Sequence, residues 1–229
     1  MFASVSRRYD LLNHLLSLNQ DKRWRRKTVE MSGFESGDLA LDVCTGTADL
    51  ALAYSEHAGD SGLVVGTDFC PEMLLLGKDK IRSEAPGRRL SLMVADTLGL
   101  PFPDNMFDIV SVGFGIRNVS DLEGGIREMT RVAKPGGRVV ILEFSMPENG
   151  MLNTAYRIYF TRVLPLIGRT VSQSGNNAYN YLPDSVLKFP RGKEMCGIME
   201  DCGLTKVSAT ELTFGIVTLY IGIKPGAED

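Results

Sequence analysis

Three polar side chains, Arg117, Asn118 and Glu143, follow or end apolar segments of the chain and are the first candidates for chemistry. The apolar segments have the composition of buried strands, and ligands of open α/β sheets bind at the carboxyl ends of the strands. The guanidinium of Arg117 is effectively always protonated, so it suits an anion stabiliser or a water-orienting group better than a base. The structural alternative is an ion pair of Arg117 with Asp121 or Glu123 that fixes the loop. Glu143 lies at a useful place, but the pattern assigns it no task.

Three acidic residues stand in or after the ends of three further apolar segments: Asp42 or Asp49, Asp68, and Asp96. A tight turn at Gly46 opens a helix, but the GxGxxG fingerprint of dinucleotide sites and the Lys-Ser/Thr ending of a phosphate loop are both missing. An acid at the position of Asp68 commonly accepts hydrogen bonds from ribose hydroxyls, and Asp96 is placed to accept a hydrogen bond from an adenine amine. Carboxylates without a phosphate cradle favour a cationic nucleoside, and S-adenosylmethionine fits that description. The alternative is that Gly46 only turns the chain and Asp49 only caps the helix.

Hydrophobic periodicity predicts the elements that position these residues. Strands are expected at 39–44, 63–67, 90–95 and 107–114, and a fifth, ending at residue 145, follows a turn at 134–137. Helices are expected at 7–29, 47–57, 71–84 and 191–202, with a further helix between the fourth and fifth strands. The last strands, 205–212 and 216–223, flank a short turn and are expected to pair antiparallel. This order predicts a single doubly wound α/β domain over residues 1–229, with a seven-stranded, mostly parallel sheet.

Two segments fall outside the alternation of strands and helices. Residues 1–30 are expected to form an N-terminal helical cap, and residues 150–190 a helical insertion, both covering the active site. The amphipathic stretch 151–171 interleaves apolar residues with Arg157, Arg162 and Arg169. The pattern leaves three roles open for it: a lid with an apolar path, a helix on an anionic membrane surface, or a homodimer interface.

Bulk composition narrows the class of protein. The 229 residues are 44% hydrophobic and 23% charged, which is typical of a globular protein of one domain. A net charge of −3 argues against nucleic-acid binding. The four cysteines form no CxxC pair, so we expect reduced thiols, no metal site and a cytoplasmic location. Peripheral contact with the inner face of the membrane is compatible with that location.

Several segments resemble one known family, the ubiquinone/menaquinone biosynthesis C-methyltransferases, which are class I S-adenosylmethionine-dependent enzymes with a Rossmann-like fold. The segments are Tyr9 to Asn13 with Ser17-Leu18 and Trp24-Arg25, Leu41 to Thr47, Phe114 to Asn118, Arg131 to Arg138 with Leu142 to Ser145, Tyr179 to Leu182, and Leu212 to Ile216. The KPGG part of this pattern is common among methyltransferases at large. FGIRN followed by LEFS is specific to the family.

The resemblance implies methyl transfer from S-adenosylmethionine to a ring carbon of a polyprenylated quinol, either demethylmenaquinol or the benzoquinol precursor of ubiquinone. It implies that Thr47, Asp68 and the pair Asp96-Thr97 bind the cofactor. Two positions depart from the family. Ala48 stands where glycine is usual, and Gly113 replaces a serine that contacts the cofactor in many members.

The implied reaction also assigns catalytic candidates. Arg117 and Asn118 would polarise the quinol hydroxyl, and Tyr9 is a third candidate. His14 and two later tyrosines are further groups able to move a proton, so the catalytic base stays open. Two other functions remain alternatives: a methyltransferase with a different small acceptor, and a non-catalytic nucleoside-binding assembly subunit. The sequence also leaves open the quinone type, the tail length and the oligomeric state.

Overall fold

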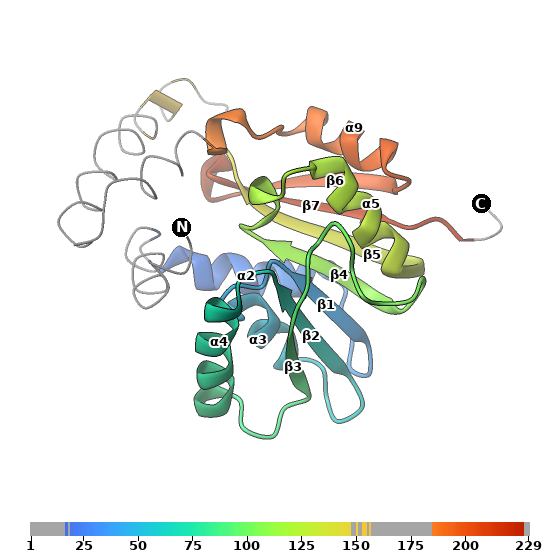
Figure 1. Cartoon of the computed structure of the whole chain (residues 1–229). Coiled ribbons are helices and arrows are strands. Elements are labelled where there is room, and N and C mark those ends of the chain that lie inside the picture. Colours follow the sequence, from blue (N-terminus) through green and yellow to red (C-terminus); the bar gives the residue numbers. More distant parts are fainter. Residues whose placement is uncertain are drawn as a thin grey trace.

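The computed structural model describes residues 17, 19–147, 150, 153–154, 156 and 185–226. Within them lies one seven-stranded sheet with the strand order β3-β2-β1-β4-β5-β7-β6 (Figure 1). The strands are β1 (Leu39–Val43), β2 (Leu63–Asp68), β3 (Leu90–Val94), β4 (Phe107–Gly113), β5 (Ala133–Phe144), β6 (Thr205–Leu212) and β7 (Val217–Ile223). The pairs among β1 to β5 are parallel, whereas β7 runs antiparallel to both β5 and β6. The predicted doubly wound α/β fold is therefore confirmed.

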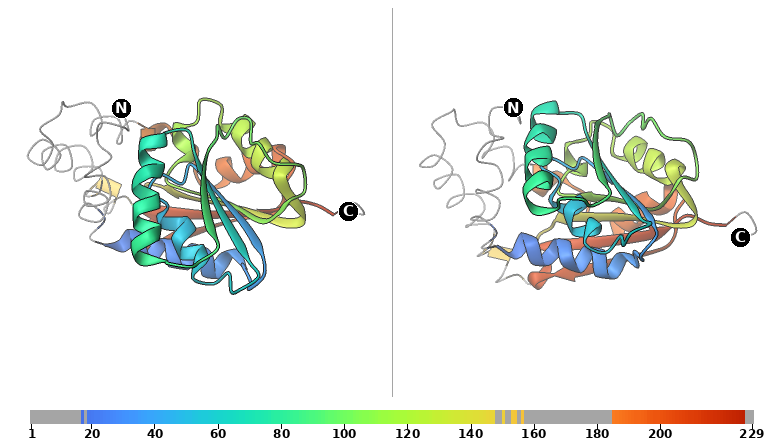
Figure 2. Two further views of the ribbon diagram at one scale, coloured as in Figure 1. Left: turned by 60° about the horizontal axis from the view of Figure 1, so that its bottom comes forward. Right: turned by 90° about the horizontal axis from the view of Figure 1, so that it is seen from below.

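Helices cover both faces of this sheet (Figures 1 and 2). The helices are α2 (Gln20–Ser32), α3 (Asp49–Ser55), α4 (Pro71–Glu84), α5 (Leu122–Val132) and α9 (Lys193–Asp201), with 3-10 turns η1 (Ile116–Asn118) and η3 (Thr213–Gly215). The core on one face joins α2 and α3 to alternate residues of β1, β2, β4, β5 and β7. The core on the other face joins α5 and α9 to the intervening residues of the same sheet. Alternation along each strand thus builds two cores, as a sheet buried on both sides requires.

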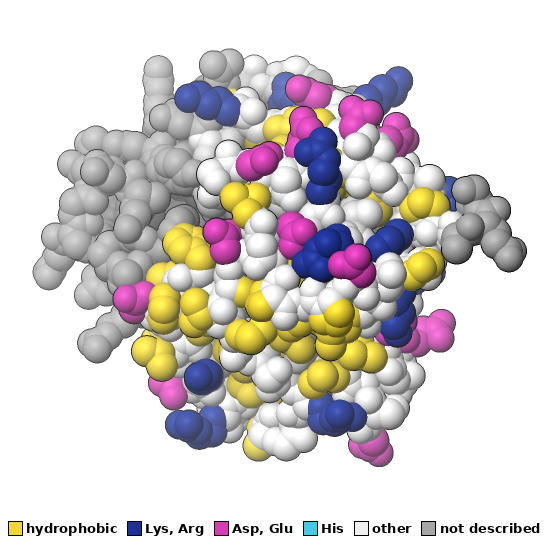
Figure 3. Space-filling model, turned by 45° about the vertical axis from the view of Figure 1, so that its right-hand side comes forward, with side chains coloured by type: hydrophobic (Ala, Val, Ile, Leu, Met, Phe, Trp, Pro, Cys, Tyr) yellow, Lys and Arg dark blue, Asp and Glu magenta, His cyan; other side chains and the backbone are white. Residues whose placement is uncertain are grey.

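The strand β3 has one face that no described helix covers, because the connection 95–106 between β3 and β4 contains no helix. Met93, whose side chain points away from the α4 side on which Leu92 packs, is exposed there. The space-filling view shows hydrophobic side chains as a band across the molecule (Figure 3). β3 is one of the two edge strands of the sheet, the other being β6.

Several predicted boundaries differ from the structure in ways that have physical causes. The turn expected at 134–137 belongs to β5. Its backbone is held there because the N–H of Gly136 donates to the carbonyl of Lys224. The pairing of β4 with β5 shifts register between Phe107 and Ile109. The alternative role of Asp49 as a helix cap is wrong, because the N-cap of α3 is Ala48 and no side chain caps the helix. Gly203, at a φ of 88°, follows α9 and ends it.

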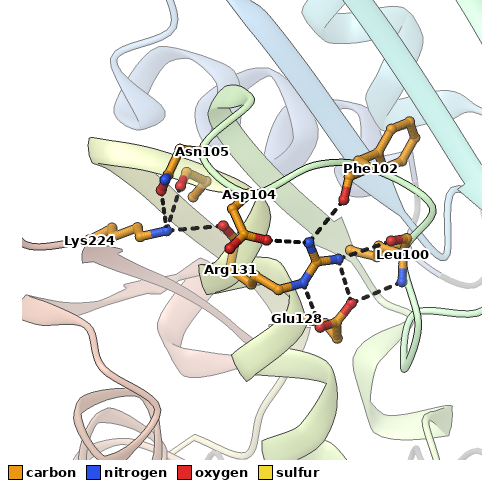
Figure 4. Close-up of polar contacts among 8 residues, drawn as sticks. Leu100, Phe102, Asp104, Asn105, Glu128, Arg131 and Lys224 are labelled. Carbon is orange, nitrogen blue, oxygen red and sulfur yellow. Dashed lines mark hydrogen bonds and ion pairs between the residues drawn. The ribbon is translucent and has the colours of Figure 1, made fainter.

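A polar cluster fastens the end of the sheet at which β4 and β5 begin (Figure 4). Arg131 donates to both carboxylate oxygens of Glu128, to Asp104 and to two loop carbonyls. Lys224 donates to Asn105 and to the carbonyls of Arg131 and Ala133. Both cations are fully used by the protein itself, and they lie at the edge opposite the carboxyl ends of the strands. We therefore regard this cluster as structural.

Candidate active site

The carboxyl ends of β1, β2 and β4 meet around a turn that follows β1. Asp42, in β1, is 1% exposed and accepts hydrogen bonds from Thr45 Oγ1 at 2.6 Å and Ser111 Oγ at 3.2 Å. Burial raises the pKa of Asp42 to about 7, against the lowering effect of both hydroxyls. Both oxygens of Asp42 therefore act inside the protein, beneath the turn.

Asp68, at the end of β2, organises this turn. Its Oδ2 accepts the backbone N–H of Gly46 at 2.9 Å, and its Oδ1 accepts the backbone N–H of Cys70 at 2.9 Å. Gly46 has a φ of 57°, a conformation for which glycine is suited. Burial raises the pKa of Asp68, while the backbone hydrogen bonds oppose that shift. Each carboxylate oxygen keeps acceptor capacity for a ligand hydroxyl.

The start of α3 carries a charge network. Lys80 Nζ, from α4, donates to Asp49 Oδ1 at 2.6 Å and to Thr47 Oγ1 at 3.2 Å. Arg25, from α2, reaches the other oxygen of Asp49 at 3.2 Å. Ala48 between them is fully buried at a φ of 69°, a left-handed conformation that costs an L-residue about 1 kcal/mol. Asp49 therefore ties α2, α3 and α4 together beside Thr47.

The loop after β3 brings two further predicted residues to the same edge. Asp96 is exposed, and its Oδ1 accepts the backbone N–H of Leu98 at 3.0 Å. Thr97 is buried, and its hydroxyl lies 3.3 Å from the thiol of Cys44. Burial raises the pKa of Cys44 to about 12, so the thiol stays neutral and is no nucleophile at physiological pH. Cys44 and Thr97 thus line the site as uncharged groups.

The FGIRN and LEFS segments meet through a buried ion pair. Arg117 Nη1, in η1, donates to Glu143 Oε1 at 2.6 Å and to the carbonyl of Phe114 at 2.5 Å. The side chains of Arg117 and Glu143 are 8% and 0% exposed. Pairing of Arg117 with Asp121 or Glu123, the structural alternative, is wrong. Asp121 caps α5 through the N–H of Gly124, and Glu123 pairs with Arg127.

Aromatic rings hold this ion pair and link it to α2. The guanidinium carbon of Arg117 lies 5.5 Å from the ring centroid of Phe144, within cation–π range. The rings of Phe144 and Phe114 are 4.5 Å apart, and Trp24 packs 6.0 Å from Phe114. The indole N–H of Trp24 donates to Thr213 Oγ1 at 2.7 Å. Four family segments therefore converge on Arg117.

Three buried polar atoms in this region have no hydrogen-bond partner within the described residues. They are Arg117 Nε, Asn118 Oδ1 and Glu143 Oε2. Each such atom costs a protein about 1–3 kcal/mol, so a gathering of three at one strand edge indicates a place for a polar ligand. One of these atoms is a hydrogen-bond donor and two are acceptors, which suits a hydroxyl group because it both donates and accepts.

Some predicted residues lie outside the described residues. These are Tyr9, His14, Tyr179 and Tyr181. Most of the part of the predicted cap that precedes α2, and most of the predicted insertion 150–190, also lie outside the described residues. Among the described residues, no three metal-ligating side chains gather into a metal site. Among the same residues, no helix is long and apolar enough to cross a membrane.

The sequence matches the ubiE/COQ5 methyltransferase family over residues 1–224. The chain belongs to this family. It is 46% identical over 224 residues to the ubiquinone/menaquinone biosynthesis C-methyltransferase UbiE of Geobacter sulfurreducens, covering 98% of this chain and 87% of the relative. It is 44% identical over 226 residues to the demethylmenaquinone methyltransferase of Thermus thermophilus, covering 98% of this chain and all of the relative.

Solved structures agree on the fold of this ubiE/COQ5 family member. A S-adenosylmethionine-dependent methyltransferase from Aquifex aeolicus superimposes with a TM-score of 0.65 at 20% identity, covering 87% of this chain and 89% of the other. The carbon methyltransferase CurJ superimposes with a TM-score of 0.61 at 14% identity, covering 84% of this chain and 50% of the other. The architecture is that of methyltransferases of this class.

Sequence reasoning missed two functional features of this family member. The partner of Arg117 is Glu143, which lies 26 residues further along the chain, in β5. A charged residue within an otherwise apolar strand was the available signal, because lone carboxylates are rarely buried. The link from Lys80 to Thr47 carried no comparable signal, since lysines at that spacing are ordinary on a solvated helix.

Proposed function

We propose that this protein transfers the methyl group of S-adenosylmethionine to a ring carbon of a demethylated polyprenyl quinol. The observation that carries the proposal is the group Arg117, Asn118 and Glu143, in which three buried polar atoms have no hydrogen-bond partner within the described residues. Relatives over nearly the whole chain are named for methylation in quinone biosynthesis, which supports the quinol as acceptor.

The residues at the ends of β1, β2 and β3 fit S-adenosylmethionine. Asp68 has acceptor capacity for ribose hydroxyls, and the exposed carboxylate of Asp96 is available to an adenine amine. The Gly46 turn leaves its Cβ position open except for Met73 Cε at 3.5 Å, so a ligand can approach the backbone closely. The turn carries no phosphate-binding lysine. The fit therefore favours a phosphate-free nucleoside, whose sulfonium supplies an electrophilic methyl group when it is bound.

The acceptor side of the reaction depends on Arg117 and Asn118. Loss of a quinol proton leaves negative charge on oxygen and on the ring carbons, and a fixed guanidinium stabilises that charge. Arg117 is held by Glu143, the carbonyl of Phe114 and the ring of Phe144, so it needs no reorganisation during the reaction. Asn118 Oδ1 is free to accept from a quinol hydroxyl. Both Arg117 Nε and Asn118 Oδ1 are buried atoms, so a hydroxyl bound to them would be largely shielded from water.

A variant of Arg117 tests the proposal, provided that its partner is considered. Replacement of Arg117 by Ala leaves the carboxylate of Glu143 buried without a cation, which costs about 3–5 kcal/mol of stability. The double variant Arg117→Met with Glu143→Gln removes both charges together. We expect its turnover of a prenyl quinol to fall at least about 100-fold while S-adenosylmethionine binds with unchanged affinity in calorimetry. Near-normal turnover would contradict the role of the pair.

Methylation assays separate the other functions left open by the sequence. A non-catalytic subunit would bind nucleoside yet methylate no acceptor. A methyltransferase with a different acceptor would methylate a small phenol without a prenyl tail as readily as a prenyl quinol. We expect the prenylated compound to be preferred, as measured by kcat/KM for matched acceptors with and without the tail.

We also propose that the enzyme works in the cytoplasm and meets its quinol at a membrane surface. Support comes from α2, where Lys22, Arg23 and Arg26 are exposed cations on the first two turns. Such a cluster is attracted to anionic lipid by about 1 kcal/mol per cation. Sedimentation with anionic vesicles is expected, and it should weaken when these three residues are changed to Gln. Equal binding to neutral vesicles would contradict an electrostatic contact.

A further inference from the structure

Glu143 is a completely buried carboxylate at the end of β5 with only one of its two oxygens in use. Oε1 accepts from Arg117 Nη1 at 2.6 Å and from the backbone N–H of Phe144 at 2.8 Å. Oε2 has no hydrogen-bond partner within the described residues. The side chain is 0% exposed. A bare carboxylate oxygen in such surroundings is costly, so its retention calls for a reason.

Charged and titratable groups approach Glu143 from three elements. Arg117 lies in η1, the thiol of Cys44 follows β1, and the phenol of Tyr220 stands on β7. Burial raises the pKa of both Cys44 and Tyr220, and negative charge on Glu143 adds to the rise. Burial raises the pKa of Glu143 itself, and Arg117 opposes that shift. Of the four groups, only the Glu143 carboxylate has an acceptor oxygen without a hydrogen-bond partner within the described residues.

The Arg131–Glu128 pair shows what a structural ion pair of this protein looks like. Glu128 Oε1 accepts from Arg131 Nε at 2.8 Å, while Oε2 accepts from Arg131 Nη2 at 2.8 Å and from the N–H of Leu100 at 3.0 Å (Figure 4). Both carboxylate oxygens are used, and the contact is two-pronged. The pair of Arg117 and Glu143 instead joins one nitrogen to one oxygen and leaves Arg117 Nε and Glu143 Oε2 bare.

The bare atoms of this pair have opposite hydrogen-bonding character. Arg117 Nε–H donates, whereas Glu143 Oε2 and Asn118 Oδ1 accept. A hydroxyl group offers one donor and two acceptor lone pairs, so a single hydroxyl can satisfy a member of each kind. The half-satisfied geometry costs stability in the free protein, a pattern typical of groups reserved for a ligand.

We propose that Glu143 is a catalytic residue of this site, whose Oε2 takes the proton of the acceptor hydroxyl. The proposal rests on the proposed function. The O–H bond of the quinol breaks and its proton moves to Oε2, while the bonding pair stays on the phenolate. Electron density from the phenolate then forms the new bond between ring carbon and methyl as the sulfonium–methyl bond breaks.

The remaining steps restore the quinol and the base. The hydrogen on the methylated ring carbon leaves as a proton to water, which returns the ring to aromaticity as a phenolate. That phenolate recovers the proton from Glu143, so one proton is released overall and no oxidant or reductant is needed. Arg117 stays protonated throughout and stabilises the phenolate before and after transfer.

The substitution Glu143→Gln tests this role with little change of shape. The amide oxygen keeps the acceptor for Arg117 and for the N–H of Phe144, whereas an NH₂ group replaces Oε2 and cannot take a proton. We expect kcat to fall by about 100-fold or more, within the range typical of lost general-base catalysis. The KM for quinol and the affinity for S-adenosylmethionine should change by only a few fold. The acidic limb of the pH profile of kcat/KM should disappear.

The matched control is Glu128→Gln, which makes the same chemical change in the satisfied pair with Arg131. It should lower the melting temperature and leave kcat and its pH profile unchanged. A second readout uses a fluorinated quinol, whose hydroxyl is more acidic. The deficit of Glu143→Gln should shrink with this substrate, because less help is needed to remove the proton; a merely structural defect would not respond.

The outcomes separate this proposal from the proposed function. A Glu143→Gln enzyme with near-normal kcat and an intact acidic limb overturns the role of Glu143, while quinol methylation by the wild type still stands. A wild-type protein that methylates no prenyl quinol overturns both. If Glu143→Gln does not fold, Glu143→Asp decides: a reduced kcat with the acidic limb retained supports the proposal, and an unchanged kcat refutes it.

Discussion

The substitution Asp42→Asn should stabilise the protein at alkaline pH, because the native fold holds Asp42 in a place that disfavours its charge. The carboxyl group is 1% exposed and contacts two hydroxyl groups, from Thr45 and Ser111. Burial raises its pKa from 3.8 to about 7. An amide has nearly the same shape, and the neighbouring hydroxyls can rotate to accept from its NH₂ group.

The magnitude follows from linkage between protonation and folding. Because the folded-state pKa is the higher one, the native protein binds the proton more tightly, and stability is lost as pH rises from 3.8 to about 7. Roughly three pKa units, at about 1.4 kcal/mol each, set an upper limit near 4 kcal/mol. The amide does not titrate, so Asp42→Asn should match the wild type at acidic pH and exceed it by roughly 2–4 kcal/mol above neutrality.

Urea unfolding of both proteins, followed by circular dichroism at a series of pH values, measures this difference. Other titrating groups contribute equally to both proteins, so the difference between them isolates Asp42. The expected difference is small at about pH 4, grows up to about pH 7 and is constant above that. A difference independent of pH, or a variant less stable than the wild type at alkaline pH, would refute the burial argument.

Two further changes test the cofactor turn. Asp68→Asn should weaken S-adenosylmethionine binding at least about tenfold in calorimetry, since the charge-assisted acceptor for ribose hydroxyls and the N–H of Gly46 is lost; unchanged affinity would place the ribose elsewhere. Ala48→Gly should raise the unfolding free energy by about 0.5–1 kcal/mol in a urea titration. Relief of the left-handed strain at Ala48 outweighs the entropy cost of glycine, and a lower value would contradict that balance.

The sheet was predictable because its strands are continuous apolar runs separated by helical patterns. The pairing of Arg117 with Glu143 was not, because it depends on the parallel register that places Gly113 of β4 beside Leu142 of β5. Sequence spacing favours a near neighbour such as Asp121 as the partner of Arg117, but in the fold Asp121 caps α5. Long-range register is the information that local periodicity lacks.

The cofactor turn likewise combines a contact that the sequence predicts with contacts that it does not predict. Asp68 stands at the end of β2 as its pattern predicts, and its contact with Gly46 could be anticipated from the parallel pairing of β1 and β2. The role of Asp49 could not, since its partners Arg25 and Lys80 come from two helices that meet only in the folded chain. Residues at strand ends are therefore easier to place from sequence than charges on helix surfaces.

The central claim is C-methylation of a prenyl quinol, and one assay tests it most directly. Purified protein is incubated with S-adenosylmethionine carrying an isotopically labelled methyl group and with short-chain demethylated prenyl quinols of the naphthalene and benzene types, kept reduced. Mass spectrometry then locates the label. If the proposed function is right, at least one quinol gains a single labelled methyl group on a ring carbon. Label on oxygen, or no label in either quinol while S-adenosylmethionine is bound, would contradict it.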